Sequence, residues 1–418
     1  MLRFAQSPTK DLDISNLRIA LLNHIFAKQI KQELLIRIDD TNKEENIEGK
    51  DKEIIKLLDL FGIDYSRVVL QSENIKYHTG MGMKLLLDKK AFNCFCSDEA
   101  LQKDKQEAKK QNKPYSYSGF CQTISDETKF NCNAPFVVRI QKPKTTIPFK
   151  DSLQGDIEFQ PNEVDSFVIL KHDKSPTYNF ASAVDDMLYD ISTLIRSENF
   201  LIDTSKQIHL RQSLGYDKKI EYYHIPNIKN SVSVQSLIDK GYLPVAIANY
   251  LVTLGIPTKK DIFTIEEACE WIDIKKLSTK PSTFDINKLN LINKEHLQII
   301  DNMRLSKIIG YADEDIGKLA KLYLSECNTT QEIKNKIDTI FNKKEPLEEF
   351  QRELKIIEEC LSNAPFINHF NELQKYIKDK TGLNDETLLR VALTGAKTGP
   401  NLSEIYPLIK NYIGEIIC

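Results

Sequence analysis

Short apolar runs alternate with helically spaced apolar residues over the first 70 positions. Residues 2–5 and 34–38 are runs of strand length, and a helix is predicted over 54–61, ending at Gly62. The apolar residues between the first two runs recur at helical spacing: Leu17, Ala20, Leu21 and Ile25. This alternation is typical of a parallel sheet covered by helices, so we expect an α/β domain here.

The pattern becomes mixed between residues 70 and 175. A lysine- and glutamine-rich helix is predicted over 101–111, and strands are predicted over 136–140, 157–160 and 167–172. The strand–helix alternation returns afterwards, with a strand at 191–195 and a helix at 205–214. We therefore expect one α/β domain that is split by an insertion.

Helical spacing alone describes the chain beyond residue 230. An apolar helix is predicted over 245–254, and Thr264 with Glu267 forms a capping box that opens a helix over 265–271. Pro281, Ser282 and Thr283 are typical of a turn. The pattern predicts no strands in this part, and hence an all-α C-terminal half.

Composition narrows the class of protein. The 418 residues suggest two or three domains. Glycine contributes only 15 residues where average usage would give roughly 29, which excludes collagen-like and glycine-rich sequences. Lys+Arg 57 against Asp+Glu 60 excludes a polycation that holds nucleic acid by bulk charge, so any such role needs a local basic face. With no long apolar run, we expect a cytoplasmic protein without membrane contact.

The informative motifs are polar stretches beside predicted strands. The chain contains neither a P-loop nor a dinucleotide-binding glycine fingerprint. Each polar stretch alone is explained by strand ends and turn residues. The ordered set comprises residues 3–9, 35–42, 176–181, 184–186 and 194–199. Together these stretches resemble the bacterial glutamate-tRNA ligases, which are class I aminoacyl-tRNA synthetases.

The resemblance extends over essentially the whole chain, because residues 241–251 and 392–400 are similar to the helical domains of that family. It implies a Rossmann-like α/β catalytic domain, an inserted α+β domain that binds the acceptor stem, and an all-α C-terminal half. The implied boundaries are 1–70 and 176–225 for the catalytic domain, 71–175 for the insertion, 226–305 for a stem-contact helical region and 306–418 for an α-helical anticodon-binding domain.

The implied activity is attachment of glutamate to tRNA(Glu) through a glutamyl-adenylate, which is made from ATP with Mg²⁺. The resemblance thus names ATP, glutamate and tRNA(Glu) as ligands, and implies a monomer that does not bind DNA.

The amino-acid pocket of the family carries over to this sequence. Arg196 would pair with the side-chain carboxylate of glutamate, a task that suits a guanidinium fork. The alternative for Arg196 is an ordinary surface ion pair. Asp39 stands where the family usually has Glu, and keeps a charge that could hold the substrate ammonium. The other implied pocket residues are Arg3, Ala5, Ser7 and Tyr178.

The ATP signatures of the family are altered. The His-x-Gly-like tetrapeptide is replaced by Asp13, Ile14, Ser15 and Asn16. A carboxylate at Asp13 would repel phosphate, so we interpret Asp13 as a helix N-cap or turn residue. The second signature, a Lys-Met-Ser-Lys-Arg-type loop, is reduced to residues 227–230, in which Lys229 is the one cation. We therefore assign no catalytic residue.

Two further functions stay open besides the ligase. One is a non-catalytic synthetase paralogue that binds tRNA, glutamate or a partner protein. The other is a helical interaction protein of synthetase ancestry.

A group of cysteines lies in the predicted insertion. Some members of the family hold a structural zinc at such a place, which implies Cys94, Cys96 and Cys121 as ligands, with either Tyr117 or Cys132 as the fourth. Buried free cysteines are the alternative. The remaining cysteines are most simply core residues: Cys269, Cys327, Cys360 and Cys418.

Overall fold

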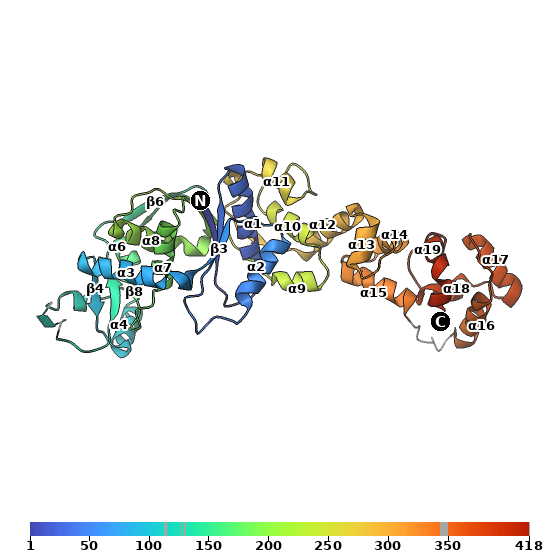
Figure 1. Cartoon of the computed structure of the whole chain (residues 1–418), viewed down its shortest axis with the longest axis horizontal. Coiled ribbons are helices and arrows are strands. Elements are labelled where there is room, and N and C mark those ends of the chain that lie inside the picture. Colours follow the sequence, from blue (N-terminus) through green and yellow to red (C-terminus); the bar gives the residue numbers. More distant parts are fainter. Residues whose placement is uncertain (113–114, 126, 129–130, 343–349, 418) are drawn as a thin grey trace. The chain divides into compact units, whose positions relative to one another are not determined.

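The computed structural model describes residues 1–417 except 113–114, 126, 129–130 and 343–349 (Figure 1). The chain forms two compact units. The first comprises Met1–Val234, Leu251–Lys259 and Phe263–Phe284, and the second comprises Gln235–Tyr250, Lys260–Ile262 and the described residues from Asp285 onward. Within the described residues, no helix combines the length and apolar character that crossing a membrane requires.

A seven-stranded sheet organises the first unit, in the order β3-β2-β1-β9-β10-β6-β7. The first six strands in this order pair in parallel, and β7 pairs antiparallel with β6 at the edge of the sheet. Central parallel strands are covered on both faces, which is why β2 and β9 are buried at every residue. The strands are β1 (Leu2–Gln6), β2 (Leu34–Ile38), β3 (Arg67–Leu70), β6 (Ile147–Asp151), β7 (Gly155–Phe159), β9 (Thr193–Ser197) and β10 (Glu221–Ile225).

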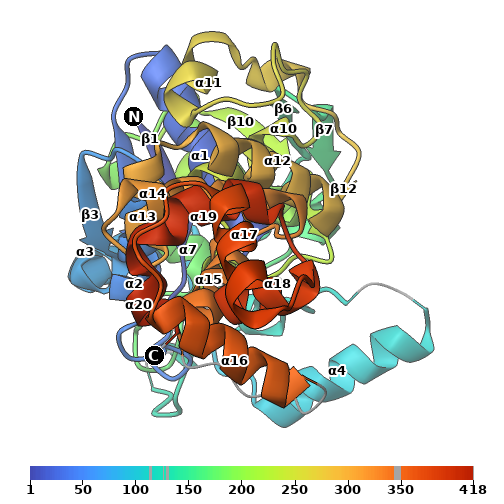
Figure 2. The same cartoon turned by 90° about the vertical axis from the view of Figure 1, so that its right-hand side faces the viewer.

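Helices cover this sheet as the alternating pattern predicts. Helix α1 (Ile14–Gln29) contacts β1 and β9 and is buried along most of its length, because α11 (Ile265–Trp271) packs beside it (Figure 2). The predicted capping box of Thr264 and Glu267 is confirmed at the start of α11. The other helices of this part are α2 (Lys50–Leu60), η1 (Gln71–Asn74), α3 (Ile75–Leu87), α7 (Tyr178–Leu188), η3 (Glu198–Phe200) and α8 (Leu201–Leu214).

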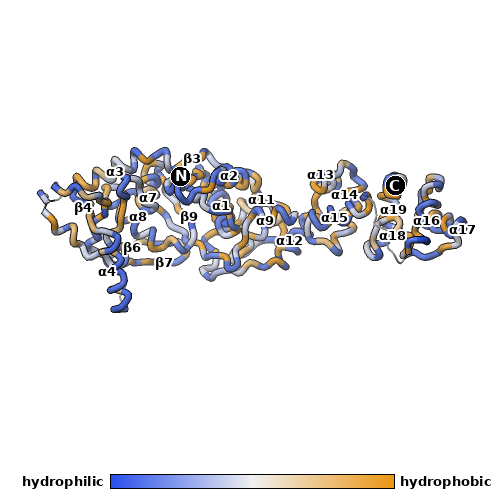
Figure 3. The backbone as a smooth tube through the Cα atoms, turned by 90° about the horizontal axis from the view of Figure 1, so that it is seen from below, coloured by the Kyte–Doolittle hydropathy of each residue, from blue (hydrophilic) through white to orange (hydrophobic). Residues whose placement is uncertain are grey.

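The residues between β3 and α7 divide between two sheets. Strands β4 (Ala91–Cys94), β5 (Val137–Ile140) and β8 (Val168–Leu170) form a separate antiparallel sheet. Strands β6 and β7 instead join the main sheet, where β6 pairs with β10. Helix α4 (Asp98–Lys110) has no buried residue and is hydrophilic along its length, in keeping with its lysine-rich sequence (Figure 3). Two short helices complete this region: η2 (Phe120–Gln122) and α6 (Pro161–Val164).

The part beyond residue 230 is helical, with one correction. The prediction that it contains no strand is wrong, because β12 (Ser282–Thr283) pairs with β11 (Ile228–Lys229) where we expected a turn. A strand of this length contains too few residues to show a period of two.

Amphipathic helices build the second unit. On α15, for example, Ile333, Ile337 and Ile340 are fully buried at helical spacing. The helices after β11 are α9 (Val234–Asp239), α10 (Pro244–Thr253), α11, η4 (Ile274–Lys276), α12 (Ile286–Ile299), α13 (Asn302–Ile308), α14 (Glu314–Leu322), η5 (Tyr323–Ser325), α15 (Thr330–Phe341), α16 (Gln351–Ser362), α17 (Phe370–Thr381), α18 (Glu386–Thr394), α19 (Leu402–Ile409), η7 (Lys410–Tyr412) and α20 (Ile413–Ile416). The α/β class with a helical C-terminal half is thus confirmed.

Candidate functional site

A cavity of about 360 Å³ opens at the carboxyl ends of β1, β2 and β9. Ligands of parallel α/β sheets bind at this edge, because the loops that follow the strands converge there. The lining includes four of the six predicted pocket residues: Ala5, Ser7, Asp39 and Tyr178. It also includes three residues of the altered ATP signature: Asp13, Ser15 and Asn16. The fourth, Ile14, is buried.

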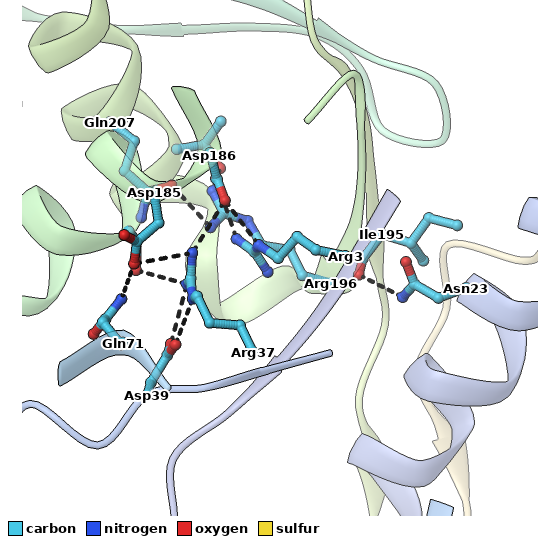
Figure 4. A network of polar contacts seen from close by, with 12 residues as sticks. Arg3, Asn23, Arg37, Asp39, Gln71, Asp185, Asp186, Ile195, Arg196 and Gln207 are labelled. Carbon is cyan, nitrogen blue, oxygen red and sulfur yellow. Dashed lines mark hydrogen bonds and ion pairs between the residues drawn. The ribbon is translucent and has the colours of Figure 1, made fainter. Parts of the chain in front are cut away.

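Arg3 and Asp39 belong to a buried network of charges beside the cavity (Figure 4). Arg3 Nε donates to Asp186 Oδ1 at 3.0 Å. Arg37 Nε donates to Asp39 Oδ1 at 2.5 Å, and Arg37 Nη1 donates to Asp186 Oδ1 at 3.1 Å. Burial raises the pKa of Asp186, but the charges of Arg3 and Arg37 outweigh it and hold this pKa below its usual range. Asp39 therefore faces the cavity with its carboxylate already fixed by Arg37.

Asp185, the residue before Asp186, completes the network from α7. Asp185 is fully buried and accepts hydrogen bonds from Gln71, Asn74 and His78. It also lies 3.8 Å from the Arg37 guanidinium. Three carboxylates therefore lie around the guanidinium groups of Arg3 and Arg37, and the charge of Arg211 also acts on Asp186.

The hydrogen bonds of Arg196 do not go to these carboxylates, although the charge of Asp186 acts on its guanidinium. It is 4% exposed, and its guanidinium contacts Gln207, Thr204 and His224, none of which carries a carboxylate. Among the residues that the structure describes, no ion pair of Arg196 is found. Burial lowers the pKa of Arg196. The surface ion pair that we kept as the alternative is therefore not what the structure places at this position.

The N-terminus of α1 forms the other end of the cavity. Asp13 is its N-cap, as predicted, because Oδ1 accepts the Asn16 amide at 2.9 Å. Asp13 Oδ2 also pairs with Lys10 Nζ at 3.2 Å. The Ile14 amide donates to the Val232 carbonyl at 3.0 Å, and the Ser15 hydroxyl bonds to the Ser231 hydroxyl at 3.1 Å. The segment after the shortened loop thus lies against the end of the helix.

The cysteine group is assembled in the region of the smaller sheet. The Sγ atoms of Cys94, Cys96 and Cys121 lie within 4.8 Å of one another. Tyr117 Oη is 3.4 Å from Sγ of both Cys94 and Cys96, whereas Cys132 is not part of the group. A tetrahedron with zinc–sulfur bonds of about 2.3 Å has edges of about 3.8 Å, so this donor set fits zinc. Burial raises the pKa of Cys96 to about 11.

Several residues of the site were missed at the level of sequence. Arg37 had one signal, since a charged residue inside an otherwise apolar strand must find buried partners. Asp186 lies in the stretch 184–186, but its sequence context predicted no role for it. His224 and its partner Asp151 had no signal, because they are 73 residues apart and meet only when β6 joins the sheet.

Comparison with known proteins identifies the family. Residues 1–291 match the family described as tRNA synthetases class I (E and Q), catalytic domain. Glutamate–tRNA ligase 2 of Sulfurimonas denitrificans and glutamate–tRNA ligase 1 of a Nitratiruptor species are each 48% identical, over 100% of this chain and 100% of theirs. Glutamate–tRNA ligase 1 of Campylobacter jejuni is 44% identical, over 100% of this chain and 99% of its own.

A solved structure agrees in fold. The glutamate tRNA ligase of Elizabethkingia meningosepticum, crystallised with its amino acid, superposes with a TM-score of 0.82 at 22% identity, covering 100% of this chain and 98% of that one. The resemblance inferred from the motifs is confirmed: this chain belongs to the class I aminoacyl-tRNA synthetases of the E and Q family.

Proposed function

We propose that this chain is a glutamate-tRNA ligase, which joins glutamate to tRNA(Glu) through a glutamyl-adenylate made from ATP and Mg²⁺. The observation that carries the proposal is 48% identity, over the full length of both chains, to proteins that bear this name. The parallel sheet and its cavity supply a matching scaffold.

The charges around the cavity support glutamate as the amino acid. Arg196 is a buried cation for which the described residues supply no direct ion pair, and such a charge is costly until an anion pairs with it. The side-chain carboxylate of glutamate would supply that anion. Asp39 presents its carboxylate to the cavity, where the substrate ammonium would lie. Arg3, Ala5, Ser7 and Tyr178 would complete this pocket.

The nucleotide end of the cavity favours a second candidate, the non-catalytic paralogue. Asp13 places a carboxylate beside the end of α1, and the Ile14 amide already donates to Val232. A phosphate at this end would meet a negative charge and one fewer free amide. Removing a single preorganised donor commonly lowers kcat by about 10²- to 10³-fold, so a ligase with this site would be slow.

Glutamate-dependent exchange between ATP and pyrophosphate, with and without tRNA, tests the ligase. The Sulfurimonas denitrificans relative serves as a parallel sample. We expect exchange that needs glutamate and ATP, and charging of tRNA(Glu). If the exchange rate does not exceed that of a sample without protein, the ligase proposal is wrong.

Binding experiments on the same preparation test the second candidate. A paralogue that still binds RNA would hold tRNA with an affinity that falls as salt rises from 50 to 200 mM, because phosphate contacts release counterions. If tRNA binding does not respond to salt, the RNA-binding form of this candidate is excluded.

The remaining assignments follow from the ligase proposal. The insertion at 71–175 would bind the acceptor stem, residues 226–305 would contact the stem, and the helices of 306–418 would bind the anticodon. The protein would act in the cytoplasm as a monomer, without DNA or membrane partners.

We also propose that Cys94, Cys96, Cys121 and Tyr117 hold a structural zinc ion. Thiols must lose their protons to bind zinc, so the bound metal would lower the pKa of Cys96. The metal would also link the turn at Cys121 to the end of β4. The expected content is one zinc per chain by mass spectrometry, lost in Cys94→Ser. Cys132→Ser is the matched control, because Cys132 lies outside the group and should leave the metal in place. If the wild-type protein contains no zinc, the zinc proposal is wrong, and the buried Cys94, Tyr117 and Cys121 with the half-buried Cys96 are ordinary packing.

A further inference from the structure

Three uncharged acceptors fix the orientation of Arg196. Its Nη1 donates to Gln207 Oε1 at 3.0 Å and its Nη2 donates to Thr204 Oγ1 at 2.5 Å. Its Nε donates to His224 Nε2 at 3.4 Å. Figure 4 shows Arg196 beside Gln207. Since each terminal nitrogen of a guanidinium carries a pair of hydrogens, one N–H on each Nη is left for an anion.

His224 accepts from Arg196 because Asp151 fixes its ring. Asp151 Oδ2 accepts from His224 Nδ1 at 2.7 Å and from the His224 amide at 3.0 Å. Its Oδ1 accepts the Leu153 and Gln154 amides. Nδ1 is therefore the protonated nitrogen, which leaves Nε2 of the neutral ring as an acceptor. Burial lowers the pKa of His224, and this keeps the ring neutral.

Thr204 contacts both Arg196 and His224. Its hydroxyl lies 2.8 Å from His224 Nε2 and 2.9 Å from the Phe200 carbonyl, while its oxygen accepts from Arg196. Asp151 ends β6, His224 lies on β10 and Thr204 lies on α8. All three side chains are buried, and the contacts therefore link three elements of the fold to one guanidinium.

We propose that Asp151, His224 and Thr204 are positioning residues that hold Arg196 so that the pocket selects a side-chain carboxylate over an amide. This inference rests on the proposed glutamate pocket. A protonated ring would lose its acceptor and place a second cation beside Arg196. A neutral ring instead accepts from Arg196 Nε, and the N–H groups left on the two Nη atoms match the two oxygens of a carboxylate. The amide of glutamine would turn an NH₂ group toward them or use a single oxygen.

Calorimetric titration of the full chain with glutamate, and separately with glutamine, tests the inference. His224→Leu removes the acceptor, and we expect glutamate affinity to fall about 10- to 100-fold, since hydrogen bonds to charged groups are among the stronger ones. Glutamine affinity should change much less, so the preference for glutamate shrinks. His224→Gln restores a neutral acceptor and should recover most of the glutamate affinity.

A second variant and a control separate positioning from folding. Thr204→Val removes the acceptor for Nη2 and should show the same selective loss, so it carries the test if His224→Leu does not fold. His209→Leu is the control, because this ring also bonds through Nε2, at 2.7 Å to the Gln141 carbonyl, but does not contact Arg196. It should leave both affinities unchanged.

The outcomes distinguish this inference from the function on which it rests. Wild-type protein that does not bind glutamate would overturn the proposed pocket and this inference together. Wild-type binding with an unchanged glutamate preference in folded His224→Leu and Thr204→Val would overturn the positioning role alone. An equal loss for glutamate and glutamine would also overturn it, because that result indicates a general structural role.

Discussion

Asp13 shows how one side chain combines two effects on the same helix end. Its carboxylate accepts the Asn16 amide and stabilises α1, while its charge faces the place where a phosphate would approach. The sequence predicted the capping role, because Asp is among the preferred N-cap residues. It could not predict that Lys10 would pair with Asp13, since both residues lie in a stretch without periodicity.

Replacing Asp13 separates these effects. Asn is as good an N-cap as Asp, so Asp13→Asn should keep stability within about 0.5 kcal/mol. Because it removes the negative charge and releases Lys10, we expect affinity for ATP with Mg²⁺ to rise about tenfold at low salt. Calorimetry and thermal unfolding measure both quantities.

Asp13→Ala is the companion variant. It removes both the charge and the cap, so it should lose about 1 kcal/mol of stability while gaining a similar ATP affinity. Equal ATP affinity in the wild type and both variants would show that the nucleotide does not approach this helix end.

At the scale of elements, periodicity predicts where helices and strands lie, whereas close packing decides which of them pair. Strands 34–38 and helix 265–271 were predicted with their observed bounds, because apolar runs and capping boxes are local signals. The sequence could not predict that β6 and β7 join the main sheet. That placement depends on the pairing of β6 with β10, which lies about 70 residues later in the chain. Helix–helix approaches are equally non-local.

Gly317 marks one such approach. A Cβ atom at this position of α14 would lie 1.9 Å from the Asn302 carbonyl oxygen, at the start of α13. Backbone cannot move aside as a side-chain end can, so Gly317→Ala should destabilise this helix pair by about 3 kcal/mol. Faster hydrogen exchange of the α13 and α14 amides would measure the loss.

Gly80 provides the matched control. It lies within α3, and a Cβ there would meet no atom within 4 Å. Gly80→Ala should therefore be neutral or stabilise the helix by up to about 1 kcal/mol. If Gly317→Ala exchanged no faster than Gly80→Ala, the close approach of α13 and α14 would be wrong.

For the molecule as a whole, the order of motifs was more informative than any single residue. The fold class and the family followed from five short stretches in a fixed order, because each of them lies at the carboxyl end of a strand or on a helix that faces the same cavity. The charge network did not follow, because Arg37, Asp39 and Asp186 are paired by geometry rather than by spacing.

The strand order also has a consequence during synthesis. Strands β3, β2 and β1 are complete once residue 70 has emerged, but the open edge of β1 pairs with β9, which ends at Ser197. At a translation rate of ~5–20 residues per second, the edge of this apolar strand stays unpaired for on the order of 10 s before β9 is synthesised. A nascent chain of this protein therefore exposes an unpaired strand to its surroundings in the ribosome's vicinity, and shielding by a chaperone would be most useful in that interval.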